Sequence, residues 1–177
     1  MSIFVDPKKA IEALDIKPGI RVADVGCGVG HYVFAVAERL EGKGKVYGID
    51  VRRNVLDKVA SEASEKGLSD VVEVILGNAE KEGGTKLADG SVDAVIASNV
   101  FFQVDDRRAL MAEIVRIVSP GGEVLIIDWL NSFGGLGPPE EYIVSAEEVK
   151  DICSSFSLEF QSEHKTGTHH YELLFKK

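Results

Sequence analysis

Three glycines follow an apolar run and an acidic residue near the start of the chain. In "VADVGCGVG" they are Gly26, Gly28 and Gly30, and Asp24 precedes them. Such a cluster between a strand and a helix lets the backbone come close to the phosphates or ribose of a nucleotide-like ligand. The dinucleotide fingerprint requires its third glycine three positions after the second, but His31 stands there. The spacing fits acid-x-Gly-x-Gly-x-Gly instead.

A second acidic residue, Asp50, ends the next apolar run of the sequence. It lies roughly 20 residues beyond the glycines, which is where a carboxylate reaches ribose hydroxyls in nucleotide-binding folds. An ionised aspartate can accept both hydroxyls because it carries no competing proton. Val51 and Arg52 come next and are expected to flank the base. A solvent-facing aspartate at a strand end is the alternative interpretation.

Further candidates follow later apolar runs. Asn78 and Ala79 come after the third run, and Ser98 and Asn99 end the fourth. His31 opens a predicted helix, where the helix N-terminus lowers the basicity of an imidazole and favours its neutral form. Asn99 and His31 are the candidates for catalysis. Their alternatives are a strand-end amide that satisfies backbone groups and a helix-start residue that covers the glycine loop.

The elements that position these residues alternate between strand and helix. Apolar runs predict strands over 20–25, 46–50, 71–76, 91–98 and 123–128, and helical periodicity covers 32–40, 54–66, a helix capped at Asp105 or Asp106 that runs through Val118, and one from Ser145 to about Ser154. "SPGG" is expected to end the third of these helices. Residues 157–165 and 168–176 alternate with period two and predict an antiparallel hairpin. Right-handed crossovers in such an α/β doubly wound sheet place all strand-to-helix loops at one edge.

Length and composition predict one domain over 1–177, with an N-terminal helical segment (1–19) and an α/β core (20–177). The net charge of -9 argues against nucleic acid or an anionic membrane as the main partner. Cys27 and Cys153 are too few for a disulfide framework or a zinc site, so we expect free thiols and a cytoplasmic protein. No metal site is expected, although Asp128 and Asn131 leave a catechol-type metal site as a minor alternative.

Taken together, these motifs resemble those of the class I S-adenosylmethionine-dependent methyltransferases. "VADVGCGVG" is similar to the family's first motif, and Asp50 to the acid that ends its second strand. "LGNAEK" (76–81) matches the adenine-contacting segment, and "SVDAVIASNVFFQV" (91–104) the fourth-strand motif. "RIVSPGGEVLIID" (116–128) is similar to the segment around the fifth strand. The resemblance implies a Rossmann-like, seven-stranded mixed sheet that closes with a C-terminal antiparallel hairpin.

The resemblance also implies S-adenosyl-L-methionine as cofactor and S-adenosyl-L-homocysteine as product. The loop of Gly26, Cys27, Gly28 and Gly30 would wrap the methionine part, and Asp24 would orient its amino group. Asp50 would bind the ribose, Asn78 or Ala79 the adenine, and Ser98 would lie beside the methyl group. Asn78 departs from the aspartate often found at the adenine contact, and loop capping is its alternative role.

The implied reaction is in-line transfer of a methyl group to a small-molecule acceptor. Methylation of a protein or an RNA is the enzymatic alternative. A non-catalytic S-adenosylmethionine-binding module and a nicotinamide-dependent oxidoreductase are the alternatives from other classes. Cover for the site is expected from the helix in "PKKAIEAL" (7–14), from the 129–144 loop acting as a lid that begins at Trp129, or from a second copy of the chain in a homodimer.

Overall fold

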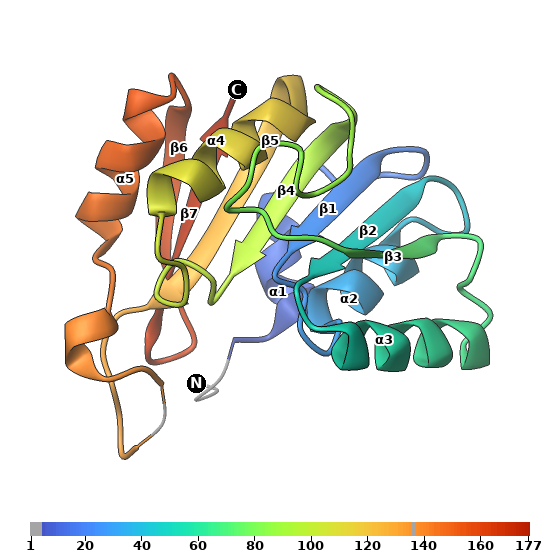
Figure 1. Cartoon of the computed structure of the whole chain (residues 1–177), viewed down its shortest axis with the longest axis horizontal. Coiled ribbons are helices and arrows are strands. Elements are labelled where there is room, and N and C mark those ends of the chain that lie inside the picture. The colour runs from blue at the N-terminus through green and yellow to red at the C-terminus, as the bar shows by residue number, and fades with distance from the viewer. Residues whose placement is uncertain (1–4, 136) are drawn as a thin grey trace.

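The computed structural model of the protein describes residues 5–135 and 137–177. Within them, seven strands form one sheet in the order β3-β2-β1-β4-β5-β7-β6, as Figure 1 shows. The strands are β1 (Arg21–Val25), β2 (Lys45–Asp50), β3 (Val72–Leu76), β4 (Val92–Ser98), β5 (Val118–Trp129), β6 (Glu159–Thr166) and β7 (His170–Lys176). β7 pairs antiparallel with β5 and β6, and the other pairs are parallel. The predicted doubly wound, seven-stranded mixed sheet with a C-terminal hairpin is therefore confirmed.

Helices cover both faces of this sheet. They are α1 (Pro7–Ala10), η1 (Ile11–Ala13), α2 (His31–Arg39), α3 (Arg53–Glu65), α4 (Arg107–Ile117), η2 (Glu140–Tyr142) and α5 (Ala146–Ser155). The helices α1, α2 and α3 pack on one face, and α4 and α5 pack on the other. Beside α4, the loop of residues 77–90 packs on the same face of the sheet, over β1, β2 and β3. This arrangement leaves the carboxyl ends of the parallel strands as an open edge.

Side chains predicted as helix caps begin two of these helices. The Asp106 carboxylate accepts from the backbone N–H groups of Arg108 and Ala109 at 3.0 and 2.9 Å. The Ser145 hydroxyl accepts from the N–H of Glu148 at 3.1 Å. Such a cap typically contributes about 1 kcal/mol because it satisfies donors that the helix itself leaves free. Both caps fix where α4 and α5 start.

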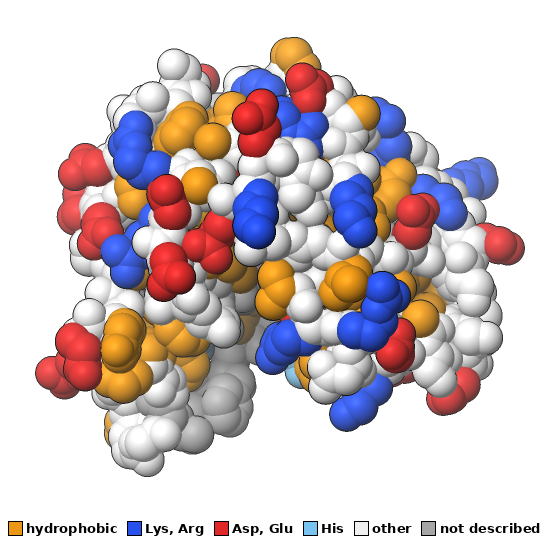
Figure 2. Space-filling view, in the orientation of Figure 1, with side chains coloured by type: hydrophobic (Ala, Val, Ile, Leu, Met, Phe, Trp, Pro, Cys, Tyr) orange, Lys and Arg blue, Asp and Glu red, His pale blue; other side chains and the backbone are white. Residues whose placement is uncertain are grey.

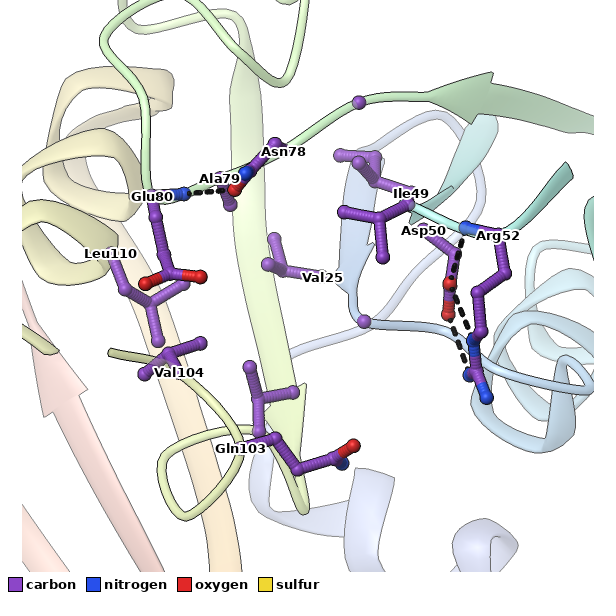
Figure 3. Close-up of a pocket in the computed structure, with 14 residues that line it drawn as sticks. Val25, Ile49, Asp50, Arg52, Asn78, Ala79, Glu80, Gln103, Val104 and Leu110 are labelled. Carbon is purple, nitrogen blue, oxygen red and sulfur yellow. Dashed lines mark hydrogen bonds and ion pairs between the residues drawn. The ribbon is translucent and has the colours of Figure 1, made fainter. Parts of the chain in front are cut away.

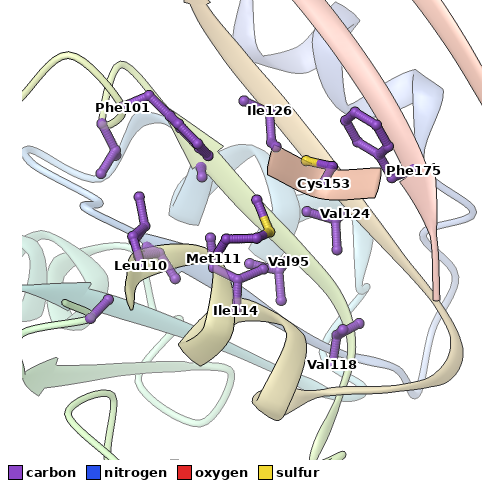
Figure 4. Close-up of a cluster of buried hydrophobic side chains, with 14 of the residues drawn as sticks. Val95, Phe101, Leu110, Met111, Ile114, Val118, Val124, Ile126, Cys153 and Phe175 are labelled. Carbon is purple, nitrogen blue, oxygen red and sulfur yellow. The ribbon is translucent and has the colours of Figure 1, made fainter. Parts of the chain in front are cut away.

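The apolar layer between these helices and the sheet is shown in Figure 4. Met111 and Ile114 of α4 and Cys153 of α5 are fully buried against Val95 of β4 and Ile126 of β5. Burying one large apolar side chain contributes about 1.5–3 kcal/mol. The layer therefore makes a rigid support for the strand ends. Both cysteines of the chain are free, as expected.

The junction between α4 and β5 differs from the prediction. Helix α4 ends at Ile117, and Val118 already belongs to the strand. The pairing with β4 moves from Val92–Val118 to Ala94–Glu123, so residues 119–122 form a bulge. A Cβ at Gly122 would lie 2.8 Å from the carbonyl oxygen of Asp93, which leaves room only for glycine. The "SPGG" segment therefore bends the start of the strand instead of preceding it.

The face seen in Figure 2 carries its charges in a mixed pattern. Acidic side chains gather over α4 and α5, whereas Lys and Arg side chains are spread over the remainder of that face. A nucleic-acid-binding surface typically shows a continuous basic stripe instead. Among the residues that the structure describes, no helix has the length and apolar character needed to span a bilayer.

Candidate active site

The glycine loop is tied to the neighbouring strand by backbone hydrogen bonds. The N–H groups of Gly26 and Cys27 donate to the carbonyl of Ile49 at 2.8 and 3.0 Å. The N–H of Gly28 donates to Oδ2 of Asp50 at 3.0 Å. The two features that the sequence placed some twenty residues apart are thus joined directly at the ends of β1 and β2.

Two glycines of the loop face different surroundings. A Cβ built on Gly26 would lie 2.6 Å from the Val100 side chain, so the loop packs closely on the segment after β4. A Cβ on Gly28 would meet nothing nearer than Arg52 Nη2 at 3.8 Å, and its φ of +52° disfavours other residues. Gly28 therefore leaves open space beside the Asp50 carboxylate.

The Cys27 side chain is buried in the core next to Gly48. Burial raises the pKa of its thiol, and the nearby carboxylates of Asp24 and Asp50 add to that rise. The thiol is therefore protonated at neutral pH and is unreactive. Only the backbone of Cys27 is therefore available to a ligand.

Both carboxylate oxygens of Asp50 are fully engaged. Oδ1 accepts from the backbone N–H and Nε of Arg52 at 2.9 and 3.0 Å, and Oδ2 accepts from Gly28 and from Arg52 Nη2 at 3.0 and 3.1 Å. Burial alone would raise the pKa of Asp50, but these donors together lower it below its usual value. A carboxylate offers about four acceptor positions. A ligand can therefore donate a hydrogen bond to Asp50 only if the exposed Arg52 side chain moves away and frees its two acceptor positions.

A cleft of about 220 Å³ opens beside this carboxylate. Six of the predicted cofactor-binding residues line it: Gly26, Asp50, Val51, Arg52, Asn78 and Ala79. Figure 3 shows Asp50 and Arg52 on one side of the cleft and Val104 and Leu110 on the other. The apolar wall formed by Val104 and Leu110 was not predicted from the sequence. Val104 lies in the fourth-strand motif but was not singled out, and Leu110 lies in no motif.

Asn78 has a local hydrogen bond in this cleft. Its Oδ1 accepts from the backbone N–H of Glu80 at 2.8 Å. The carboxylate of Glu80 in turn accepts from the N–H groups of Asp105 and Asp106, both at 2.9 Å. The side-chain oxygen of Asn78 thus caps the loop, which was the alternative role considered for it. Its amide nitrogen and the backbone of Ala79 remain as the groups that could meet a base.

Asp24 lies beneath the glycine loop and is 1% exposed. Its Oδ2 has no hydrogen-bond partner among the described residues. Burial, together with the nearby charge of Asp50, raises the pKa of Asp24 to about 7. A cationic ligand group beside this oxygen would both satisfy it and stabilise its ionised form.

A second cavity of about 320 Å³ lies beyond the end of β4. Its lining includes His31, Tyr32, Ser98, Asn99, Trp129 and His170. Ser98 faces this cavity, whereas the next-but-one residue, Val100, lines the first cleft. Both candidates for catalysis, Asn99 and His31, are also here. Trp129 and His170 come together because β5 pairs with β7, which no local sequence signal reveals.

The residues of the metal alternative have partners within the fold. The Asp128 carboxylate accepts from the N–H groups of Phe101 and Trp129 at 3.0 and 2.8 Å. Burial raises the pKa of Asp128 to about 6. Asn131 Oδ1 lies 2.6 Å from Nδ1 of His169. Within residues 5–135 and 137–177, no group of three or more His, Cys, Asp or Glu side chains is arranged to hold a metal ion.

Known proteins are similar to this chain in sequence and in fold. A family model described as a methyltransferase domain matches residues 16–176. Nocamycin O-methyltransferase from Saccharothrix syringae is 34% identical over 66% of this chain and 40% of its own length. Phosphoethanolamine N-methyltransferase 3 from Arabidopsis thaliana is 32% identical over 71% of this chain and 24% of its own. The chain thus spans less than half of these two relatives.

A solved structure matches almost the whole chain. The structure described as a SAM dependent methyltransferase from Aquifex aeolicus has a TM-score of 0.87 and is 27% identical, and the match covers 97% of this chain and 89% of that one. The family match likewise extends from before the first strand of the sheet to its last. The chain therefore belongs to the class I S-adenosylmethionine-dependent methyltransferases.

Proposed function

We propose that the protein transfers a methyl group from S-adenosylmethionine to a small-molecule acceptor and releases S-adenosylhomocysteine. The observation that carries this proposal is the direct link between the glycine loop and Asp50 at the head of the first cleft. Family membership supports the choice of cofactor.

The residues of the cleft fit the cofactor. Asp50 would bind the ribose hydroxyls in the positions that the Arg52 side chain now fills. Arg52 and Val51 would then flank the adenine, with Asn78 and Ala79 across the cleft. Because the Arg52 side chain is more than half exposed, water can solvate its guanidinium after release, and the ribose hydroxyls would replace the hydrogen bonds that Asp50 loses.

The glycine loop would hold the methionine part of the cofactor. The open space beside Gly28 gives its backbone room for a ligand, and Gly26, Cys27 and Gly30 would complete the turn. The unpartnered oxygen of Asp24 suits the cofactor's amino group. Ser98 would lie beside the methyl group, at the boundary of the two cavities.

The bound cofactor supplies an electrophilic methyl group on a sulfonium. The protein's part is to hold the acceptor in line with that group, and orientation can contribute roughly 7–11 kcal/mol in favourable cases. Asn99 and His31 would contact the acceptor from the walls of the second cavity.

Two observations support a small-molecule acceptor. The relatives named above methylate, by their names, nocamycin and phosphoethanolamine. The volume of the second cavity, about 320 Å³, is within the range of small-molecule pockets. The face in Figure 2 lacks a continuous basic stripe. The free, buried cysteines support a reducing compartment, for which we propose the cytoplasm.

A screen with methyl-labelled S-adenosylmethionine tests this function. Pools of small molecules, total RNA and total protein are each incubated with the wild type and with Asp50→Ala. We expect label only in a small-molecule pool, and only with the wild type. Label in RNA or protein would overturn the acceptor class. Binding of the cofactor without transfer in any pool would indicate a binding module.

A further inference from the structure

Three residues that line the second cavity each have a buried polar atom without a hydrogen-bond partner among the described residues: Oδ1 of Asn99, Nδ1 of His170 and the hydroxyl of Tyr32. A buried polar atom without a partner is costly, so such atoms usually have one in the working state of a protein. Three of them around one cavity point to a ligand that supplies hydrogen bonds.

The backbone of Asn99 has an unusual conformation and is held by hydrogen bonds on both sides. Its φ is +57°, in the left-handed region that asparagine tolerates better than most residues. Its N–H donates to the carbonyl of Ile127 at 2.8 Å, and its own carbonyl accepts from the side chain of Gln103. The backbone is thus fully bonded, while the buried side-chain oxygen has no hydrogen-bond partner among the described residues.

His170 is held against an aromatic wall. His170 on β7 pairs with Trp129 on β5. The centroids of the two rings lie 4.1 Å apart, and the ring planes are at 40°. The side chain is almost completely buried. Burial, and to a lesser degree the nearby His169, lower the pKa of His170 to about 4. At neutral pH the ring is therefore uncharged, and Nδ1 can accept a hydrogen bond in the tautomer that carries its hydrogen on Nε2.

Together the cavity presents hydrogen-bond acceptors between aromatic side chains. The Asn99 amide oxygen can only accept, and a neutral imidazole can accept at Nδ1. The Tyr32 hydroxyl, which has Ser98 beside it, can both donate and accept, and its ring adds a further aromatic side chain to Trp129 and His170. The complementary ligand is planar, uncharged and bears a hydrogen-bond donor.

We propose that the acceptor is an aromatic hydroxyl compound and that His170 is a further catalytic residue, which takes the hydroxyl proton on Nδ1. This inference rests on the proposed function. The acceptor oxygen forms the new C–O bond and the C–S bond breaks with its electron pair on sulfur. The hydroxyl proton moves to His170 as this bond forms, because an oxygen that is being methylated is far more acidic than the imidazolium. One positive charge is thus lost from sulfur and one is gained by the imidazole, so the net charge of the cavity does not change.

Binding of 4-nitrophenol and of 4-nitroanisole is compared at a pH between the pKa of His170, about 4, and that of the phenol, because only the protonated phenol carries a donor. Trp129 is the only tryptophan of the chain, and it lies in the cavity wall, so quenching of its fluorescence reports occupancy. The proteins are saturated with S-adenosylhomocysteine, whose own binding is measured first by calorimetry. We expect the wild type to prefer the phenol by about tenfold.

His170→Phe keeps an aromatic ring beside Trp129 but removes the acceptor, so the preference for the phenol should vanish. His164→Phe, the same substitution on the exposed edge strand β6, should retain it. His170→Leu provides a second apolar variant if the phenylalanine impairs folding. Equal binding of both probes to the wild type, or a preference kept without His170, would overturn the inference. Failure of S-adenosylhomocysteine to bind would instead contradict the proposed function.

Discussion

At the scale of single residues, Gly28 can be substituted to test whether a ligand needs the space beside it, apart from the effect of the substitution on the backbone. Its φ is +52°, and a Cβ there would enter open space beside Arg52. Gly42, in the turn between α2 and β2, also has a positive φ, of +78°, with no atom within 4 Å of a built Cβ. Valine at either position costs stability because a β-branched residue disfavours that backbone region.

We expect Gly28→Val to abolish binding of S-adenosylhomocysteine by steric exclusion. Gly42→Val should bind it as the wild type does, although both variants lose a similar amount of thermal stability, on the order of 1–2 kcal/mol. Calorimetry and thermal unfolding measure the two effects separately. Equal affinities of the two variants would remove Gly28 from the site.

Asp24 links the site to stability through its protonation. The pKa of Asp24 is about 7 in the folded protein, raised by burial from an unfolded value near 3.8. Between these values the folded state holds a proton that the unfolded state has released, so this residue's contribution to stability falls as pH rises from about 4 to about 7.

We expect Asp24→Asn to be more stable than the wild type above pH 7, and the difference to shrink as pH falls to 4. The raised pKa of Asp128 affects both proteins alike and cancels in the comparison. The variant should also bind the cofactor more weakly because the amide cannot pair with its amino group. Thermal unfolding across this pH range checks the first point. A difference that does not depend on pH would contradict the account.

At the scale of elements, Glu113 fastens the 77–90 loop to α4. Its carboxylate accepts from the N–H of Gly83, from the N–H and hydroxyl of Thr85, and from the Arg116 guanidinium, at 2.6–3.0 Å. Burial alone would raise the pKa of Glu113, but Arg116 and Thr85 bring it down to about 2. The same loop carries Asn78 and Ala79 to the cleft.

We expect Glu113→Gln to destabilise the protein at pH 7 by on the order of 3 kcal/mol. A lowered carboxyl pKa stabilises above the unfolded value of about 4.5 and loses its effect as pH falls toward 2, so the two proteins should converge in acid. Glu62→Gln, which breaks an exposed ion pair with Lys66 on α3, serves as control and should change little. Denaturant unfolding at pH 7 and pH 3 measures the free energy of unfolding of each protein and tests both expectations.

Local patterns predicted most elements but not the contacts between distant ones. Strand β1 and the capped starts of α4 and α5 follow from apolar runs and from Asp106 and Ser145, which act within a few residues. The extension of β5 back to Val118 depends on pairing with β4, which outweighs the expected helix end. The lid role of the 129–144 loop stays a prediction, and Leu136 within it lies outside the described residues.

At the scale of the whole molecule, the sheet brings two cavities to one edge. Glycines and acids mark the first cleft because its backbone geometry tolerates few alternatives, so it could be predicted from the sequence. His31, Ser98, Asn99 and Trp129 of the second cavity were also candidates, whereas His170 was not, because it joins the cavity only through pairing of β7 with β5. We propose that the cofactor occupies the first cleft and the acceptor the second, whose lining includes Ser98 and Asn99.

Calorimetric titration of S-adenosylhomocysteine into the wild type and into Asp50→Ala tests the central claim most directly, with NAD as the competing ligand. The account predicts one S-adenosylhomocysteine per chain, no binding of NAD, and affinity reduced about tenfold or more in the variant, because each lost charged hydrogen bond is worth roughly 1.5–3 kcal/mol. Binding of NAD without S-adenosylhomocysteine, or unchanged affinity in a folded Asp50→Ala protein, would contradict it.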